Sequence, residues 1–484
     1  MSIRPCLILV WMVAGLQVLS MGQDQPSQNS TTQNSSNDGT VRTAPAAALS
    51  ALAGMEPEGG TADTNNDLPQ IPALLGGKGT STAFLSELER SNYLRGGLNV
   101  GATYDDNPLL LSSGVESNTS ETIFPNIRIE ESTSRTRWSL GYAGGLTVNQ
   151  KITSQNQGSH NLNFDSQCRL SPHVNLRVAE AFSLTTGFFD AGSGSEVVAS
   201  SGGPNASLIT PLATQRSSLT TVETNYHFAR NDLIGASGSF YAIDFTNVPT
   251  PPAGTQPTQL TDTQTASGSA FWLHLLFHGD WGGVSYRFDR ITFSGGSGET
   301  RVHSFLAVDT LSLWKRLTLT GFLGPQYSEN QGLVNVAAQS TQSSGWSVSG
   351  GAQGGWQGER TSVTAGYSRS ITDGGGVLGA DHLQTVQANF RRVLVPGWAF
   401  ALNASHGTNQ SITEPFANSA TSINLTSAGI SLERNVGKNI GLRMGYAHDF
   451  QEQFGVPGTT QTLNASRNRF FVTLSYQWAK PLGM

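Results

Sequence analysis

From Leu94 onward, apolar and polar residues alternate along most of the chain. In the first such stretch, Leu98 and Val100 fall on one face and Asn99 falls on the other. A period of two residues is that of a β-strand, whose successive side chains point to opposite faces. The pattern predicts a series of strands that each have one apolar and one polar side.

The segment Trp138–Val148 shows this alternation over its whole length. Leu140 and Leu146 share the apolar face, and Ala143 lies on the opposite face. If the apolar face meets lipid and the other face meets water, an arginine should be tolerated at position 143. The same arginine at position 146 should destabilise the protein.

The links between these strands alternate in length. Eight short links interleave with nine long ones, and the short links lie at Glu131–Arg135, Ser171–His173, Ala229–Asp232, His278–Asp280, Trp314–Arg316, Gln357–Arg360, Val395–Gly397 and Asn435–Asn439. An even number of strands, with both chain ends on the side of the short turns, is typical of outer-membrane barrels. The expected fold is all-β: one transmembrane, antiparallel, up-and-down β-barrel of about sixteen to eighteen strands.

Three segments fit the alternation poorly. In Val284–Phe293 the apolar residues change face after Phe288, which predicts a bulge near Asp289–Arg290. The two halves of Ile423–Arg434 point opposite ways, and Glu180 falls on an otherwise apolar face. These irregularities leave the number of strands open by two.

A strand near the C-terminus ends in aromatic residues. Its apolar face is formed by Phe470, Val472, Leu474, Tyr476 and Trp478. Aromatic side chains are favoured at the interface between membrane and water. The pattern resembles the closing strand and assembly signal of outer-membrane β-barrels, although six further residues, Ala479–Met484, follow it.

A second resemblance lies in Leu94–Asn107, which has the sequence LRGGLNVGATYDDN. It is a glycine-rich amphipathic strand that ends in Tyr-Asp-Asp-Asn, and it resembles the opening strand of β-barrel porin families of Gram-negative envelopes. The resemblance implies an outer-membrane barrel whose partners are outer-membrane lipid and the barrel assembly machinery. It implies no particular substrate.

The residues before the barrel divide into three parts. Residues 1–22 have a basic start and a short apolar core, which predict a signal peptide. Residues 23–80 are rich in small polar residues and predict a disordered leader in the periplasm. Residues 81–93 form a short connector with a candidate helix at 82–90, and the barrel is expected to occupy 94–484.

The composition agrees with a barrel that crosses a membrane. Charged residues make up 13% of the chain, against roughly 25% in an average soluble domain. The chain has 55 glycines, and its net charge of −6 gives no support for nucleic-acid binding.

Charged residues on the polar faces are the candidate lumen residues. They are Arg95, Arg128, Glu130, Arg137, Asp165, Arg169, Arg177, Arg287, Asp289, Arg301, Asp309, Arg443 and Asp449. In a barrel this wide the interior holds water or a plug, so such charges either filter solutes or brace the wall as salt bridges.

Two loop motifs have competing interpretations. Asp105–Asn107 could bind calcium through its oxygens, or could end a strand and start a turn. Gly374, Gly376 and Gly379 match a phosphate-binding pattern, but the segment that follows predicts a strand rather than the helix this binding requires. No metal site and no cofactor are therefore expected.

The other candidate catalytic groups are two acid–base pairs, His448 with Asp449 and His303 with Asp309. His448 and Asp449 are neighbours in sequence, but neighbours on a strand point to opposite faces and cannot form a dyad. The chain is expected not to be an enzyme.

These observations predict a porin-like channel of the bacterial outer membrane that lets small hydrophilic solutes diffuse passively. The alternatives are the barrel of a polysaccharide export or envelope assembly system and, less favoured, an outer-membrane hydrolase. The oligomeric state, including a homo-oligomer, stays open.

Overall fold

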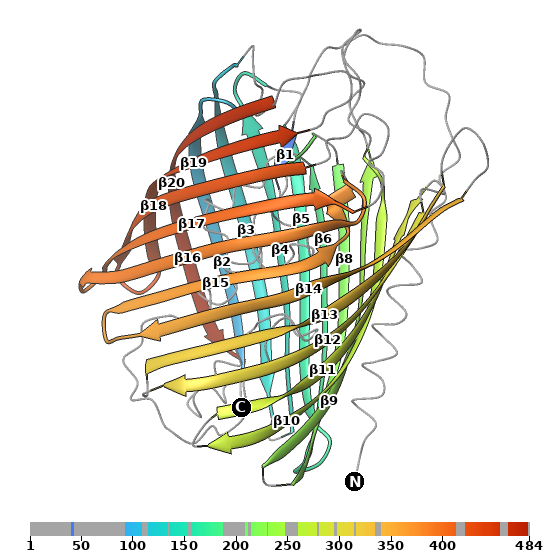
Figure 1. Cartoon of the computed structure of the whole chain (residues 1–484). Helices are drawn as coiled ribbons and strands as arrows, with labels where there is room; N and C mark the ends of the chain where they lie inside the picture. The colour runs from blue at the N-terminus through green and yellow to red at the C-terminus, as the bar shows by residue number, and fades with distance from the viewer. Residues whose placement is uncertain are drawn as a thin grey trace, which may run out of the picture.

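The structure is a computed structural model that describes residues 40–42, 92–108, 115–133, 135–152, 156–186, 209–211, 214–229, 231–246, 260–277, 280–294, 298–313, 316–333, 340–376, 378–412, 422–454 and 463–482. Eighteen antiparallel strands form one closed barrel, as the alternation predicts (Figure 1). Among the described residues, no helix has the length and apolar character needed to cross a membrane.

The barrel strands follow one another in chain order. They are β2 (Tyr93–Asp105), β3 (Asn118–Ser132), β4 (Thr136–Asn149), β5 (Gln157–Arg169), β6 (Val174–Thr186), β8 (Thr214–Ala229), β9 (Asp232–Thr246), β10 (Thr263–Phe277), β11 (Asp280–Phe293), β12 (Gly298–Leu313), β13 (Leu317–Leu333), β14 (Ser340–Gln357), β15 (Thr361–Thr372), β16 (Asp381–Val395), β17 (Trp398–Ser411), β18 (Ser422–Val436), β19 (Ile440–Phe454) and β20 (Leu463–Pro481). The first strand, β2, pairs with the last, β20, and this pairing closes the barrel.

A separate two-stranded sheet joins β1 (Thr40–Arg42) to β7 (Ile209–Pro211). The segment with β7 connects β6 to β8 at the end of the barrel that carries the long links. The expected signal peptide and the rest of the leader and connector, up to residue 91, lie outside the described residues.

The predicted rhythm of short and long links is found with one exception. All eight predicted short links join consecutive strands at one end, called here the short-link end, and the other nine join them at the long-link end. The β11–β12 link spans only residues 294–297, so it is as short as the β5–β6 link at 170–173. The strand count is the upper of the two predicted values.

The outer face is apolar and partly exposed. On β2, for example, Leu98 and Val100 are each 41% exposed, whereas Asn99 on the inner face is 5% exposed. Five strands each carry a tryptophan on the outer face near the short-link end: Trp138, Trp272, Trp356, Trp398 and Trp478. A ring of tryptophans is typical of a membrane–water interface.

The closing strand β20 shows the same division. All five apolar residues of the predicted assembly signal are exposed on the outer face, from Phe470 at 55% to Trp478 at 38%. Phe471, on the opposite face, is 6% exposed. The alternation in this segment therefore corresponds to the two sides of the barrel wall.

The prediction of a bulge near Asp289–Arg290 is wrong. The pairing of β11 with β10 and β12 runs without a register shift through these residues. Ile291 and Phe293 instead point inward and are 1% and 7% exposed. The same holds for Ile423 on β18, because apolar side chains near the long-link end pack inside the barrel rather than against lipid.

Candidate pore and its lining

The inner wall carries most of the candidate lumen charges. Strand registers put eleven of the thirteen on the inner face: Arg95, Arg128, Glu130, Arg137, Asp165, Arg169, Arg177, Arg287, Asp289, Arg443 and Asp449.

Arg301 and Asp309 do not lie on the inner face. Both share the outer face of β12 with Phe305, which is 53% exposed. On this strand the inner face is the apolar one, and Val302 on it is fully buried. Polarity alone therefore assigned these two residues to the wrong side.

Near the short-link end, inner-face charges form ion pairs within the wall. Arg177 contacts Asp165 at 2.6 Å and Glu223 at 3.5 Å. On β3, Arg128 contacts Glu130 at 2.8 Å, and Arg95 on the neighbouring strand β2 reaches the same carboxylate at 3.4 Å. These side chains brace neighbouring strands.

A second group of paired charges lies on β16, β18 and β19. Arg391 and Arg443 share Glu433, at 3.2 Å and 3.8 Å. Arg137 and Arg169, in contrast, form no ion pair within the described part of the chain. These two guanidinium groups, on adjacent strands β4 and β5, leave a positive charge at the short-link mouth.

The inner wall of β9–β13 is apolar in its short-link half. A buried cluster there consists of Leu233, Phe271, Leu273, Trp281, Leu306, Val308 and Phe322. None of these residues was predicted to face inward, because alternation shows that a strand has two sides without showing which side is the inner one. The lining therefore has a charged sector and an apolar sector.

The β15–β16 loop folds into the barrel. The Thr261 amide donates to the Gly376 carbonyl over 2.9 Å, and the Thr263 hydroxyl donates to Asp373 over 3.0 Å. Thr263 lies on the inner face of β10, and β11–β14 separate β10 from β15 in the sheet. Only a route through the interior joins these residues, so the loop narrows the lumen.

Apolar packing holds the same loop against the wall. Ala380 and Ile371 pack with Ile291, Phe293 and Val302, which lie on the inner faces of β11 and β12. The inward orientation of Ile291 and Phe293 follows from this contact, since these side chains have an apolar partner inside the barrel.

Glycine allows the loop to turn so tightly. Gly374, Gly375 and Gly376 have φ angles of 64°, 60° and 77°, in the left-handed region that favours glycine. A Cβ on Gly376 would lie 2.4 Å from a ring carbon of Phe245 on β9. A strand follows the loop, so the glycine pattern belongs to a turn, as predicted, and not to a phosphate site.

Asp373 is fully enclosed at the base of the loop. Its carboxylate accepts hydrogen bonds from the Thr263 hydroxyl and, over 3.2 Å, from the Gly375 amide. Burial raises the pKa of this carboxyl above its ordinary value, and these two hydrogen bonds oppose the shift only in part.

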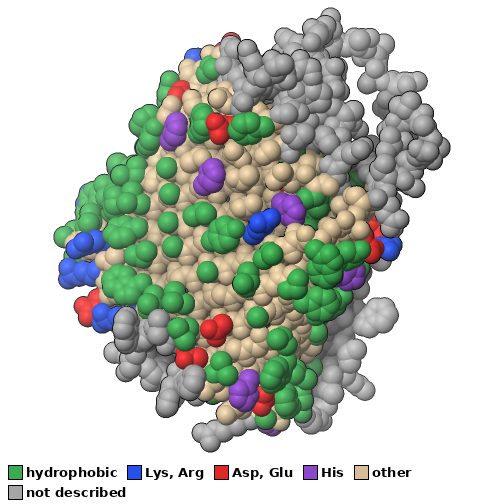
Figure 2. Space-filling view, viewed as in Figure 1, with side chains coloured by type: hydrophobic (Ala, Val, Ile, Leu, Met, Phe, Trp, Pro, Cys, Tyr) green, Lys and Arg blue, Asp and Glu red, His purple; other side chains and the backbone are tan. Residues whose placement is uncertain are grey.

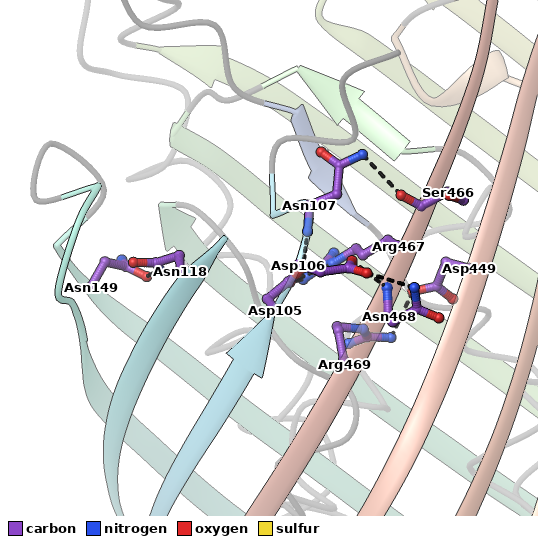
Figure 3. Close-up of polar contacts among 10 residues, drawn as sticks. All are labelled: Asp105, Asp106, Asn107, Asn118, Asn149, Asp449, Ser466, Arg467, Asn468 and Arg469. Carbon is purple, nitrogen blue, oxygen red and sulfur yellow. Dashed lines mark hydrogen bonds and ion pairs between the residues drawn. The ribbon is translucent and has the colours of Figure 1, made fainter. Parts of the chain in front are cut away.

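The Tyr-Asp-Asp-Asn motif joins the first strand to the last (Figure 3). Asp106 accepts hydrogen bonds from the amide and the side chain of Asn468, both at 2.6 Å, and Asn107 donates to the Ser466 carbonyl over 2.9 Å. Asp105 pairs with Arg467. Both carboxylates accept hydrogen bonds from groups of the protein itself, which supports the turn interpretation over calcium binding.

A second ion pair extends this seam to β19. Arg469 contacts Asp449 at 2.9 Å, and Asp449 has no exposed surface. Figure 3 shows both pairs side by side at the junction of β2, β20 and β19. Arg467 and Arg469 were not among the predicted lumen charges, although their two-residue spacing from Phe471 puts all three on the inner face of β20.

The histidines that were candidate catalytic groups lie on the outer face. His303 and His448 alternate with exposed apolar residues there, and the Nδ1 atoms lie 2.9 Å from Tyr286 and Asn468. His448 and Asp449 face opposite sides, as their spacing predicts. No group of three or more acidic, histidine or cysteine side chains suited to a metal occurs in the described ranges.

Neither the protein-family models nor the curated proteins contain a match to this chain. Among solved structures, the outer membrane protein OpdK from Pseudomonas aeruginosa is similar at a TM-score of 0.40 and 10% identity, covering 80% of this chain and 99% of that one. OprD from the same organism is similar at a TM-score of 0.38 and 11% identity, covering 81% of this chain and 96% of that one. The ferric citrate transporter FecA is similar at a TM-score of 0.40 and 10% identity, covering 79% of this chain and 78% of that one.

Likenesses this distant carry no argument about function. The geometry of the chain itself does support an argument about function. The barrel is closed, its outer face is mostly apolar, its lining has a charged and polar sector beside an apolar one, and a loop folds into its interior. Such an arrangement can pass or retain polar solutes.

Proposed function

We propose that this chain is a porin-like barrel of the bacterial outer membrane that lets small hydrophilic solutes diffuse passively. The observation that carries the proposal is the closed wall of eighteen strands, with exposed apolar side chains outside and charged and polar side chains lining the inside except in the apolar sector of β9–β13. Barrels of about sixteen to eighteen strands are wide enough to leave an aqueous channel. The proposal assigns no catalytic role to the chain.

The short-link end is placed at the periplasm and the long-link end outside the cell. This orientation follows from the usual pattern of short periplasmic turns and longer extracellular loops. It puts the loop around Gly374–Gly376 in the extracellular half of the lumen, where it acts as the constriction. The same orientation puts β1, which pairs with β7 in a long link, on the extracellular side, so a wholly periplasmic leader does not fit this pairing.

The lining favours anions at the periplasmic mouth. Arg137 and Arg169 have no acidic partner in the described residues, whereas Arg177 and Arg128 are paired. Fixed positive charge at the entrance of a narrow pore raises the local concentration of anions. A modest preference for chloride over potassium is therefore expected.

Single-channel recording in planar bilayers tests the proposal. The purified full chain should conduct, and a salt gradient should give a reversal potential of the sign that marks anion preference. Replacing Arg137 and Arg169 with Gln should reduce that preference. Arg301→Gln is the matched control, because this arginine lies on the outer face. A folded barrel that never conducts would exclude the channel.

A further inference from the structure

The outer face of β16–β18 is basic at the short-link end. Arg392 on β16 and Arg434 on β18 are exposed there, and no Asp or Glu lies on the outer face of these three strands within the described residues. Figure 2 shows basic side chains gathered beside apolar ones at the left edge, where these strands reach their short links in Figure 1. This part of the outer wall therefore carries positive charge.

The strand registers show that both arginines point away from the lumen. Arg392 pairs with Phe400 on β17, and Arg434 pairs with Trp398 on the same face of that strand. Leu402 shares this face of β17 and is 41% exposed. The β16–β17 and β17–β18 ladders run through all of these pairs, so this end of the three strands is part of the closed wall.

Neither arginine has an acidic partner in the described part of the chain, unlike other arginines of the barrel. On the inner face of the same strands, Arg391 contacts Glu433 at 3.2 Å. On the outer face near the long-link end, Arg216 contacts Asp244 at 2.6 Å. A cation at the edge of a lipid-facing wall is stable only when water or an anion meets it. Its partner at this site therefore comes from the surroundings.

The tryptophans of the short-link end lie in two different electrostatic settings. On β9–β10, Trp272 donates its indole N–H to Asp232 over 3.1 Å. On β17–β18, the guanidinium of Arg434 instead lies over the ring of Trp398, 4.9 Å from its centroid. This cation–π contact holds the positive charge at the level of the tryptophans, which is the level of lipid headgroups. The membrane interface thus has an acidic sector at β9–β10 and a basic sector at β16–β18.

Apolar surface continues from the two arginines toward the middle of the wall. Leu402 and Ile430 pair across β17–β18 and are 41% and 42% exposed. Ala404 and Ala428 form the next pair on the same face, and both are exposed. An acyl chain can lie against this uncharged surface while its headgroup stays beside the arginines. The arrangement matches the two ends of an anionic lipid better than a free anion.

We infer that Arg392 and Arg434 bind the phosphodiester of an anionic phospholipid in the leaflet at the short-link end. A planar guanidinium matches two phosphate oxygens in a bidentate geometry. In the proposed orientation this leaflet is the periplasmic one. The inference rests on the proposed membrane barrel but not on conduction, so a barrel that proves closed to ions would leave it unaffected.

Lipid retention by the full chain tests this inference. The protein is reconstituted in phosphatidylcholine vesicles that contain phosphatidylglycerol, re-extracted in mild detergent and examined by native mass spectrometry. The wild type should retain phosphatidylglycerol above its share of the bilayer. Arg392→Gln and Arg434→Gln should each lower the retained ratio of phosphatidylglycerol to phosphatidylcholine by about fivefold. Arg434→Lys should give an intermediate ratio, because it keeps the charge without the planar fork.

Arg316→Gln is the matched control, since this exposed arginine lies at the same end of the barrel and already contacts Glu359 at 3.6 Å. An equal ratio in the wild type and in the variant that combines Arg392→Gln with Arg434→Gln would overturn the inference. An equal loss in Arg316→Gln would also overturn it, because net charge would then explain the effect. Displacement of phosphatidylglycerol by excess inorganic phosphate would indicate a free-anion site instead. If the double variant fails to fold, the two single variants provide the same comparison.

Discussion

At the scale of single residues, the side of the wall decides what a new charge does. Leu402 on β17 is 41% exposed on the outer face, and its neighbour Asn403 is exposed on the inner face. Leu402→Arg should cost roughly 2–4 kcal/mol of unfolding free energy, because it puts a charge against lipid. Asn403→Arg should cost much less and should alter single-channel conductance. Urea unfolding in vesicles and bilayer recording measure the two effects.

Ala143 lies at a packed point of the inner wall, unlike Asn403. It is on the inner face, as alternation predicts, but it is 3% exposed between Asn126 and Asn161. The expectation that an arginine is tolerated there is wrong, because the lining is closely packed at this point rather than open to water. If Leu402→Arg were neutral while Asn403→Arg unfolded the barrel, the assignment of faces would be inverted.

Asp373 links loop docking to pH. Its pKa is raised when the loop is docked, so the docked loop binds a proton more tightly than the undocked one. The resulting stabilisation is fully present below the ordinary value of 3.8 and is lost as pH rises through the raised value. Acidification should therefore lengthen the low-conductance states. Asp373→Asn should show long closures at all pH values, and an unchanged pH response in this variant would rule out Asp373 as the titrating group.

At the scale of elements, the inward loop depends on close contact between its glycines and the far wall. Gly376→Val would clash with Phe245 and with the Thr261 carbonyl, and its φ angle would be strained. The loop should leave the lumen and the conductance should rise. Gly268→Ala is the control, because a Cβ at that position would have no other heavy atom within 4 Å. A conductance equal to wild type in Gly376→Val would show that the loop is not the constriction.

The closing strand should fail to assemble when its outer face is charged. Tyr476→Asp combined with Trp478→Asp places two carboxylates where aromatic side chains meet lipid. The chain should then remain unfolded, which heat-modifiable migration on gels detects. Gln477→Asp, on the exposed inner face of β20, should migrate normally. Normal migration of the double variant would show that the apolar face of this strand is not needed for assembly.

At the scale of the whole molecule, the leader and the barrel should be separable. Residues 23–80 have too few apolar residues to offset the entropy of ordering them. Deleting 25–70 removes only the short β1–β7 pairing from the described structure, so the melting temperature and membrane insertion should stay unchanged. A large drop in melting temperature would mean that the leader packs against the barrel.

The sequence by itself determined the fold class, the strand order and the two faces of most strands. Strands such as β2, β4 and β20 alternate because one side meets lipid, and this requirement acts on every second residue regardless of its partners. The rhythm of the links then limited the number of strands to sixteen to eighteen and placed both ends of the barrel chain on one side.

Only the tertiary structure decided which face of β11, β12 and β18 points inward near the long-link end. Ile291, Val302 and Ile423 are apolar because the interior is packed there, and the same apolar character elsewhere marks the lipid side. The inward loop and the Asp105–Arg467 seam depend on contacts between residues far apart in the chain. Alternation records the environment of each side chain separately, so it contains no information about which distant residue provides that environment.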